Sequence, residues 1–170
     1  MYIGIIGYGV VGKALAYGFK KLGHTIYIYD IAYKEYSDIV PLLVCDITFV
    51  ALPTPMNEDG SCDTSIVEQV LDYYIHGGYK GIIAIKSTVP IGTTDKLIQK
   101  YPYAKICHNP ELLKERYAMC DMKNQDICLI GTDDDFIFNI LAEFHKPFVK
   151  KIIRLKTNET EAAKYFNNSL

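Results

Sequence analysis

A chain of 170 residues is long enough for one domain with a substantial core, and a hydrophobic content of 49% is typical of a globular protein. A net charge of −2 without any basic tract argues against nucleic acid as a partner. No apolar run approaches the roughly 20 residues of a membrane-spanning helix, and the N-terminus has the pattern of a strand rather than a signal peptide. The five scattered cysteines contain no C-x-x-C pair, which indicates reduced thiols and a cytoplasmic protein.

The chain begins with the pattern of a dinucleotide site. An apolar strand, Tyr2–Ile6, leads into Gly7, Gly9 and Gly12, and a helix is predicted over Val10–Leu22. In such a Gly-x-Gly-x-x-Gly turn the first glycine permits the sharp bend, the second lets a pyrophosphate approach the backbone, and the third lets the helix pack closely on the strand. The N–H groups at the start of the helix would then face the phosphates.

A second predicted strand, Thr25–Tyr29, ends at Asp30, which lies 18 residues after Gly12. A carboxylate at this place can accept hydrogen bonds from both ribose hydroxyls of the cofactor, and it would repel a 2′-phosphate. The expected cofactor is therefore NAD rather than NADP. The alternative, a glycine-rich turn without function, does not account for strand, helix, strand and acid following in this order.

The rest of the chain alternates between strands and helices. The further strands are predicted at Ile47–Leu52, Gly81–Ile85, Lys105–Cys107, Ile127–Ile130 and Lys151–Leu155, and the further helices near Thr64–His76, Thr93–Lys100, Asp133–Phe144 and Glu159–Asn168. Several strands are almost continuously apolar, which is typical of strands covered on both faces. The predicted fold is α/β and Rossmann-like, a doubly wound and mainly parallel sheet with helices on both faces. Ligands would bind beyond the carboxyl ends of its strands.

Two of these strand ends carry hydroxyl groups. Ile47–Leu52 runs into Pro53 and Thr54 of a Pro-Thr-Pro sequence, whose prolines stop the strand and stiffen a loop beside the predicted dinucleotide. A turn without further function is the alternative for this loop. Gly81–Ile85 runs into Lys-Ser-Thr-Val-Pro, where Thr88 would lie in the crevice and is the stronger functional candidate.

Three predicted helices begin beside side chains that can accept a hydrogen bond from the first helical turn. The candidate caps are Asp63 or Thr64, Thr93 or Thr94, and Thr157 or Asn158. A purely structural role is expected for these residues.

Glu111 and Glu115 follow the strand at Lys105–Cys107 and are four residues apart, so on a helix they would share one face. Two carboxylates at the mouth of a nucleotide crevice can do acid–base work. By spacing alone the stronger interpretation is a solvated helix face. His108 has no His or Cys partner at ligand spacing, and no metal site is expected.

The last predicted helix carries Lys164 and Asn168, which are also four residues apart. A cation and an amide donor on one helix face can stabilise a developing oxyanion. By pattern alone, however, this segment is interpreted as an ordinary surface helix.

Taken in order, these segments resemble the nucleotide-sugar dehydrogenases, the UDP-glucose and GDP-mannose 6-dehydrogenase family. The resemblance lies in Gly-Tyr-Gly-Val-Val-Gly, Pro-Thr-Pro with Asp-Gly-Ser-x-Asp-Thr, Lys-Ser-Thr-Val-Pro-x-Gly-Thr-Thr, Asn-Pro-Glu-Leu-Leu-x-Glu and Glu-Ala-Ala-Lys-x-x-x-Asn, and it covers nearly the whole chain. The family oxidises a sugar 6-alcohol to a carboxylate with two NAD and a cysteine that forms a thiohemiacetal and then a thioester. The resemblance thus favours functional roles for the two glutamates and for the lysine and asparagine of the last helix.

The resemblance implies a role for each matching position. The implied cofactor contacts are Gly7, Gly9, Val10, Val11, Gly12, Asp30, Lys34, Pro53, Thr54, Thr88 and Glu115. The implied catalytic residues are Thr88 and Glu111, which organise a water, Glu115, and Lys164 and Asn168, which stabilise the oxyanion on C6. Leu112 and Leu113 lie in the segment that lines the sugar.

The chain also departs from the family in two places. Only 23 residues separate Asp30 from Thr54, where the family has a longer segment, so an abbreviated sheet edge and weaker NAD binding are expected. The family continues beyond the last helix into a dimerisation helix and a sugar-binding domain that supplies the nucleophilic cysteine in a Gly-x-Cys-x-x-Lys-Asp setting. Residues 1–156 are therefore expected to form the NAD-binding domain, and residues 157–170 to begin the connecting helix.

These departures predict a domain that binds NAD but does not complete the reaction alone, with a possible homodimer in a full-length form. One alternative is a non-catalytic or split-subunit NAD-binding module that acts with a partner chain. Another is a domain of the β-hydroxyacid dehydrogenase type, which also places a lysine and an asparagine four apart on this helix. The Pro-Thr-Pro and Ser-Thr-Val-Pro loops argue against that second alternative.

Overall fold

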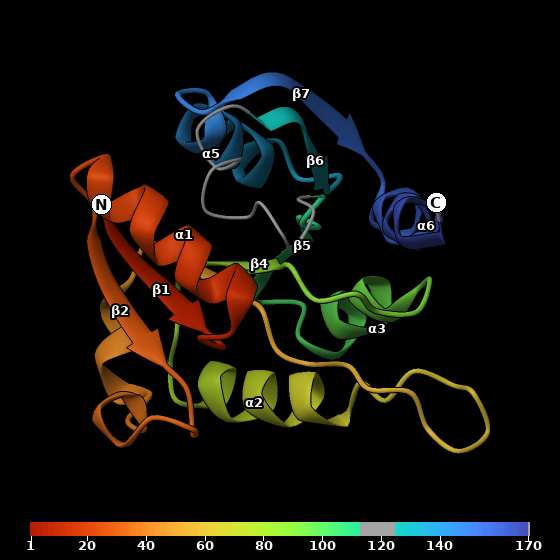
Figure 1. Ribbon diagram of the computed structural model, residues 1–170, viewed down its shortest axis with the longest axis horizontal. Coiled ribbons are helices and arrows are strands. Elements are labelled where there is room, and N and C mark those ends of the chain that lie inside the picture. The colour runs from red at the N-terminus through yellow and green to blue at the C-terminus, as the bar shows by residue number, and fades with distance from the viewer. Residues whose placement is uncertain (113–124, 170) are drawn as a thin grey trace.

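The computed structural model describes residues 1–112 and 125–169, and over these residues it shows one seven-stranded sheet with helices on both faces (Figure 1). The strands are β1 (Tyr2–Ile6), β2 (Thr25–Tyr29), β3 (Ile47–Val50), β4 (Ile82–Ile85), β5 (Lys105–His108), β6 (Gln125–Gly131) and β7 (Val149–Leu155). The helices are α1 (Val10–Lys21), α2 (Ser65–His76), α3 (Thr93–Lys100), α5 (Asp135–His145) and α6 (Thr157–Ser169), with two 3-10 turns, η1 (Lys34–Tyr36) and η2 (Val40–Val44). The predicted α/β fold class is confirmed.

The strand order is β2-β1-β3-β4-β5-β6-β7, and all pairs are parallel except β5 with β6. Helical crossovers make neighbouring strands parallel, because each helix returns the chain to the same edge of the sheet. The antiparallel pair is short, since its register is the single pairing of His108 with Gly131. Because β1 to β5 are parallel to one another, their carboxyl ends lie at the same end of the sheet.

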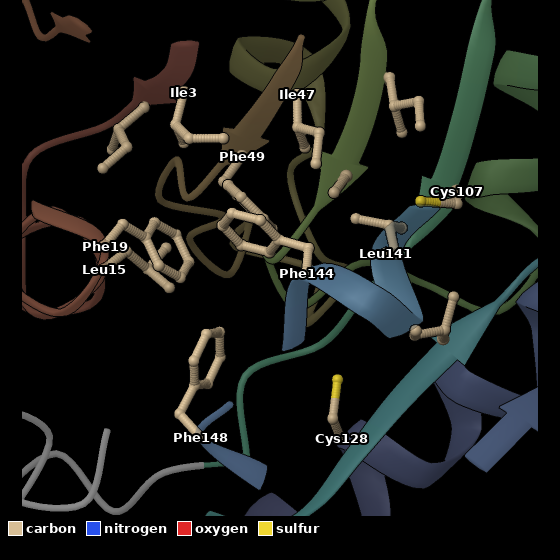
Figure 2. Close-up of a cluster of buried hydrophobic side chains, with 14 of the residues drawn as sticks. Ile3, Leu15, Phe19, Ile47, Phe49, Cys107, Cys128, Leu141, Phe144 and Phe148 are labelled. Atoms are coloured by element: carbon tan, nitrogen blue, oxygen red, sulfur yellow. The ribbon is translucent and has the colours of Figure 1, made fainter. Parts of the chain in front are cut away.

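Each face of the sheet has its own hydrophobic core. On one face, Phe19 of α1 packs against Phe49 of β3 and Phe144 of α5, with ring centroids 5.1 and 4.7 Å apart (Figure 2). On the other face, Leu71 and Tyr74 of α2 are fully buried against the strands. A buried side chain of this size stabilises the fold by about 1.5–3 kcal/mol. These two cores hold the loops at the strand ends in fixed positions.

The connection between β2 and β3 is abbreviated, as expected, because η1 and η2 are the only helical turns in this fully described stretch. The strand β2 is therefore an edge of the sheet. Leu42 of η2 is buried, and its carbonyl oxygen accepts a 2.6 Å hydrogen bond from the Tyr74 hydroxyl. The short segment is thus tied to the core instead of carrying another strand.

The predicted helix caps are only partly right. The Asp63 carboxylate accepts a 2.8 Å hydrogen bond from the N–H of Ser65 at the start of α2, whereas Thr64 occupies the N-cap position but donates its hydroxyl to Glu68 and makes no side-chain cap bond. The last helix begins at Thr157, two residues earlier than predicted, so neither Thr157 nor Asn158 caps it. Glu159 in the first turn instead accepts from the N–H of residue 156, just before the helix, at 2.8 Å, which is one half of a capping box.

Within the described part of the chain, no helix combines the length and the apolar character needed to cross a membrane.

Candidate functional site

The glycine turn between β1 and α1 leaves open space at one glycine and none at the other two. Gly7 has φ +94°, and a Cβ there would lie 2.4 Å from the carbonyl oxygen of Ala51. A Cβ on Gly12 would lie 1.9 Å from the carbonyl oxygen of Gly7. A Cβ on Gly9 would have no neighbouring atom within 4 Å. Only Gly9 therefore faces a space that a ligand can enter.

The start of α1 has the hydrogen-bond donors that a pyrophosphate needs. Gly9 is the N-cap of the helix and has no side chain to satisfy the first turn. The N–H groups of Val10, Val11 and Gly12 have no acceptor within the helix, because the first intrahelical bond runs from the N–H of Lys13 to the Gly9 carbonyl. These donors and the positive end of the helix dipole fit an anionic group above Gly9.

Asp30 lies directly beside this turn. Its Oδ2 accepts a 2.6 Å hydrogen bond from the N–H of Tyr8, and its Oδ1 accepts a 2.8 Å bond from the N–H of Ala32. Each carboxylate oxygen has a second lone pair, so the side chain is fixed in orientation and can still accept from two ribose hydroxyls. Lys34, the other residue expected near the ribose, is exposed at the start of η1.

The two hydroxyl-bearing loops are joined to each other. Thr54 donates a 2.7 Å hydrogen bond from its hydroxyl to the carbonyl oxygen of Thr88, and Ser87 donates one of 2.7 Å to the carbonyl oxygen of Leu52. Pro53 is exposed between them. The structure therefore brings Thr54 and Thr88 together from neighbouring strand ends, although they are 34 residues apart in the chain.

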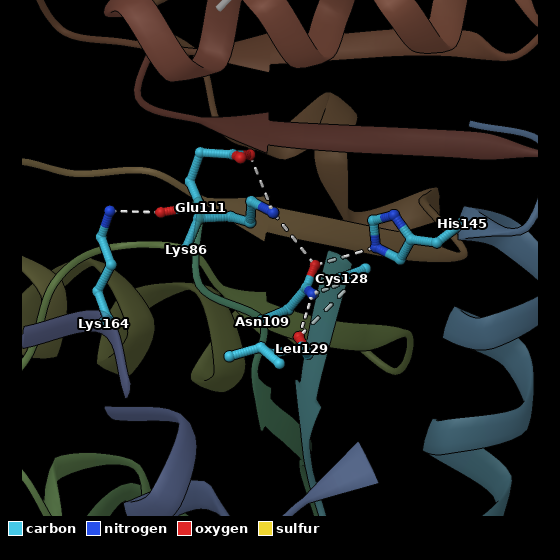
Figure 3. Close-up of polar contacts among 7 residues, drawn as sticks. All are labelled: Lys86, Asn109, Glu111, Cys128, Leu129, His145 and Lys164. Atoms are coloured by element: carbon cyan, nitrogen blue, oxygen red, sulfur yellow. Dashed lines mark hydrogen bonds and ion pairs between the residues drawn. The ribbon is translucent and has the colours of Figure 1, made fainter. Parts of the chain in front are cut away.

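A buried ion pair lies at the ends of β4 and β5. The Nζ of Lys86 is 3.2 Å from Oε2 of Glu111, and the two side chains are only 3% and 6% exposed (Figure 3). Lys164 of α6 reaches the same place and donates a hydrogen bond to the backbone carbonyl of Glu111. The burial of Glu111 contradicts the prediction, made from its spacing to Glu115, that it lies on a solvated helix face.

The ion pair continues into a neutral network. Oδ1 of Asn109 accepts from Nζ of Lys86 at 3.3 Å and from Nε2 of His145 at 3.0 Å, while Nδ2 of Asn109 donates to the carbonyl oxygen of Leu129 at 2.7 Å (Figure 3). Because Asn109 is the acceptor, His145 carries its proton on Nε2. Complete burial lowers the pKa of His145 well below its usual value and keeps the ring neutral. Lys86 thus connects the ion pair with Glu111 to the uncharged side chains of Asn109 and His145.

A buried glutamate connects α6 to the Ser-Thr-Val-Pro loop. Glu161 is fully buried, and its two oxygens accept from the N–H of Gly92 at 2.6 Å and from the N–H of Thr94 at 2.8 Å. The prediction that Thr93 or Thr94 caps α3 is therefore wrong. A carboxylate from another helix stabilises these free N–H groups, and it holds the turn that carries Lys164 against α3.

The remaining predicted residues are distributed as follows. Leu112 is half-buried just after Glu111, whereas Leu113 and Glu115 lie outside the described residues. Asn168 lies in α6 one turn after Lys164, and the position of its side chain is not among the described features. His108 is bound to the Thr160 hydroxyl at 2.8 Å, and burial lowers the pKa of its ring to about 4. Among the described residues, no group of three or more His, Cys, Asp or Glu is arranged to hold a metal.

Sequence reasoning assigned no role to Lys86, Asn109, His145 or Glu161. Lys86 and Asn109 were visible as polar residues directly following apolar strands, which is where this fold binds ligands. His145 and Glu161 had no such signal, because each acts on a segment far away in the sequence. A surface hollow of about 740 Å³ along α2 shares no residue with this site; it is lined by Ser65, Glu68, Gln69, Asp72, Tyr73, His76, Gly77 and Lys100.

Residues 33–149 match the model of the UDP-glucose/GDP-mannose dehydrogenase family, NAD binding domain. UDP-glucose 6-dehydrogenase TuaD of Bacillus subtilis is 31% identical over an alignment that covers 73% of this chain and 29% of the relative. UDP-glucose 6-dehydrogenase AglM of Haloferax volcanii is 27% identical, with coverage of 99% and 51%. The structure of a UDP-glucose dehydrogenase from Pyrobaculum islandicum superposes with a TM-score of 0.87 at 26% identity, covering 98% of this chain and 49% of the other. The chain thus spans about half or less of the length of these relatives.

Proposed function

Because this chain belongs to the UDP-glucose/GDP-mannose dehydrogenase family and carries its NAD-binding domain, we propose that it binds NAD across the ends of β1 to β4 and serves the oxidation of a sugar nucleotide. The observation that carries this proposal is the convergence of two groups of residues at one sheet edge. One group is the glycine turn with Asp30, and the other is the buried pair of Lys86 and Glu111 with Lys164 above it.

The chain's own residues supply the binding and orientation of the cofactor. The N–H groups of Val10 and Val11 bind the pyrophosphate above Gly9, and Asp30 accepts from the ribose hydroxyls while disfavouring a 2′-phosphate. Thr54 and Thr88 hold the two loops together beside it. When bound, NAD accepts a hydride from the alcohol carbon of the substrate.

The polar network supplies charge at the reacting end. Glu111 is the acceptor that orients a water or the substrate hydroxyl, together with Thr88 on the neighbouring strand end. Lys164 provides the positive charge for an oxyanion on the substrate, with Asn168 one turn further along α6. The family resemblance also implies a cofactor contact for Glu115, which lies outside the described residues. The family resemblance and the burial of Glu111 support these assignments.

We also propose that the chain does not complete the oxidation by itself. The family's second step needs a thiolate, and the buried cysteines described in this structure are poor sources of one. Burial raises the pKa of the Cys45 thiol to about 12 and raises the pKa values of Cys107 and Cys128 as well. A partner domain or partner chain would supply the nucleophile and the sugar site.

Calorimetric titration tests the binding proposal. We expect NAD to bind, NADP to bind more weakly, and Asp30→Ala to reduce NAD affinity at least tenfold, about 1.4 kcal/mol or more. Asp133→Ala is the matched control, because Asp133 is an exposed aspartate at the turn before α5. Equal binding of NAD by the wild type and Asp30→Ala would contradict the ribose contact.

An absorbance assay for NADH tests the second proposal. With UDP-glucose and NAD, we expect no sustained, stoichiometric formation of NADH by this chain alone. Full turnover by the purified chain would refute the need for a partner. Activity on small hydroxyacids without activity on sugar nucleotides would instead identify a β-hydroxyacid dehydrogenase-type domain.

A further inference from the structure

Three tyrosine rings gather beside Asp30 in the short segment between β2 and β3. The ring of Tyr8, which lies between the first two glycines of the turn, meets Tyr33 at a centroid distance of 5.7 Å and Tyr36 at 5.3 Å. Both contacts are edge-on, with interplanar angles of 77° and 78°. The rings of Tyr33 and Tyr36 are 6.0 Å apart, and all three side chains are half-buried. Part of each ring is therefore accessible to a ligand.

The backbone holds this tyrosine cluster (Tyr8, Tyr33 and Tyr36) against the end of β2. The N–H of Tyr33 donates to the Asp30 carbonyl at 3.2 Å, and the N–H of Asp30 donates to the Tyr36 carbonyl at 2.9 Å. These two bonds close the segment into a tight loop whose first and last residues contact the same aspartate. The position of the rings relative to the Asp30 carboxylate is fixed as a result.

A cation stabilises the cluster from the side of α1. The Nζ of Lys13 lies 5.3 Å from the centroid of Tyr33 and 5.7 Å from that of Tyr8, within the range of a cation–π interaction. A hydrogen bond with Tyr33 also raises the pKa of Lys13, with smaller contributions from Tyr8 and Asp30. Three elements, the glycine turn, α1 and η1, thus converge on this one group of rings.

We propose that Tyr33 and Tyr36 form the wall against which the adenine base of the dinucleotide packs. This inference rests on the proposed NAD site, in which Asp30 binds the adenosine ribose. The base is bonded directly to that ribose, so it must lie against the side chains that surround Asp30. Aromatic rings bind a flat base by stacking, and half-buried tyrosines present the required apolar surface with a small loss of conformational freedom.

The proposal is tested by measuring the affinities of NAD, ADP-ribose and nicotinamide mononucleotide by calorimetry. ADP-ribose contains the adenosine without the nicotinamide, and nicotinamide mononucleotide contains no adenosine. We expect Tyr33→Ala and Tyr36→Ala to weaken NAD and ADP-ribose each by about tenfold, and to leave nicotinamide mononucleotide unchanged. Tyr103→Ala, which removes an exposed ring between α3 and β5, is the matched control and should change none of the three.

A conservative variant separates stacking from other effects. Tyr33→Phe keeps the ring and should retain the affinity for ADP-ribose, and circular dichroism identifies any variant that does not fold. Equal affinities of wild type and both alanine variants, with binding still lost in Asp30→Ala, would overturn the wall and leave the NAD site standing. A loss in Tyr33→Phe as large as in Tyr33→Ala would assign the effect to the hydroxyl and also overturn it. Absence of NAD binding by the wild type would overturn the wall together with the NAD site.

Discussion

The ion pair of Lys86 and Glu111 places two opposite charges in the interior of the protein. Both side chains are almost completely buried, with Nζ and Oε2 3.2 Å apart. Removing two charges from water costs several kcal/mol per ion, and their attraction and additional hydrogen bonds offset this cost only while both partners are present. Such a pair is expensive to maintain beside a core, which is consistent with a role in the proposed chemistry.

Breaking this pair should destabilise the chain strongly. Lys86→Met removes the cation that lies 3.2 Å from the buried Glu111 carboxylate, so we expect the free energy of unfolding to fall by about 3–5 kcal/mol in urea titrations. The double variant Lys86→Met/Glu111→Gln should recover part of the loss, because the buried carboxylate charge is removed together with the lysine. The surface pair of Lys146 and Glu143 is the control, and Lys146→Met should stay within about 0.5 kcal/mol. A small effect of Lys86→Met would contradict a dominant role of Lys86 in stabilising the Glu111 carboxylate.

Two glycines of the same turn should respond to substitution in opposite ways. Gly12→Ala places a Cβ 1.9 Å from the Gly7 carbonyl oxygen, so we expect a loss of about 1–3 kcal/mol in stability. Gly9→Ala meets no atom within 4 Å and should fold with nearly unchanged stability, while its methyl group enters the proposed pyrophosphate space and weakens NAD binding. Thermal unfolding and NAD titration of both variants distinguish the two effects. Normal NAD affinity in Gly9→Ala would place the phosphates elsewhere.

A buried histidine gives stability a defined pH dependence. Burial lowers the pKa of His108 from 6.5 to about 4, so the folded state favours the neutral ring. Its contribution is fully present above pH 6.5 and is lost as the pH falls towards 4, because the unfolded chain binds the proton first. In His108→Gln we expect a shallower loss of stability over this range, by up to about 1.4 kcal/mol per pH unit. Identical slopes in urea titrations of the two proteins would mean that His108 is solvated.

Among the secondary-structure elements, α6 is joined to the start of α3 by its own side chains. Glu161 bonds the N–H groups at the start of α3, and Thr157 donates to Asp95 of α3. This contact positions Lys164, one turn further along α6, over the backbone of Glu111. The helix is therefore part of the site rather than a surface helix packed beside it.

Removing the Glu161 carboxylate charge should destabilise the start of α3. Glu161→Gln keeps the size of the side chain and removes its charge and one acceptor, so we expect a loss of about 1–2 kcal/mol. Hydrogen exchange of the Gly92 and Thr94 amides should accelerate more than exchange in α2. Glu159→Gln is the control within the same helix, because Glu159 is exposed at its first turn. Unchanged protection at Gly92 and Thr94 would show that the carboxylate charge contributes nothing there.

In the molecule as a whole, the hydrophobic cores and the loops at the strand ends have separate roles. The cores under α1 with α5 and under α2 with α3 fix the strands, and the loops at their carboxyl ends carry the polar side chains. The connection that follows the edge strand β2 is short. In place of a longer crossover it contains η1 and η2, with the buried Leu42 and two tyrosines of the cluster, Tyr33 and Tyr36.

The order of strands and helices, the parallel α/β class, the glycine turn and the short connection after the second strand could all be predicted from the sequence. These features depend on local patterns, namely apolar runs, glycine spacing and the number of residues between Asp30 and Thr54. Their signals are contained within a few tens of residues, and the structure reproduces the predicted strands to within a few residues at their ends.

Which polar residues contact one another became apparent only in the folded chain. The bond of Glu161 to Gly92 joins residues 69 positions apart, and that of His145 to Asn109 joins residues 36 apart. Local spacing predicted a solvated face for Glu111 and a local cap for α3, and both predictions are wrong for the same physical reason. A buried charge or free N–H group takes whichever partner the packing brings to it, and that partner is chosen by the fold of distant segments.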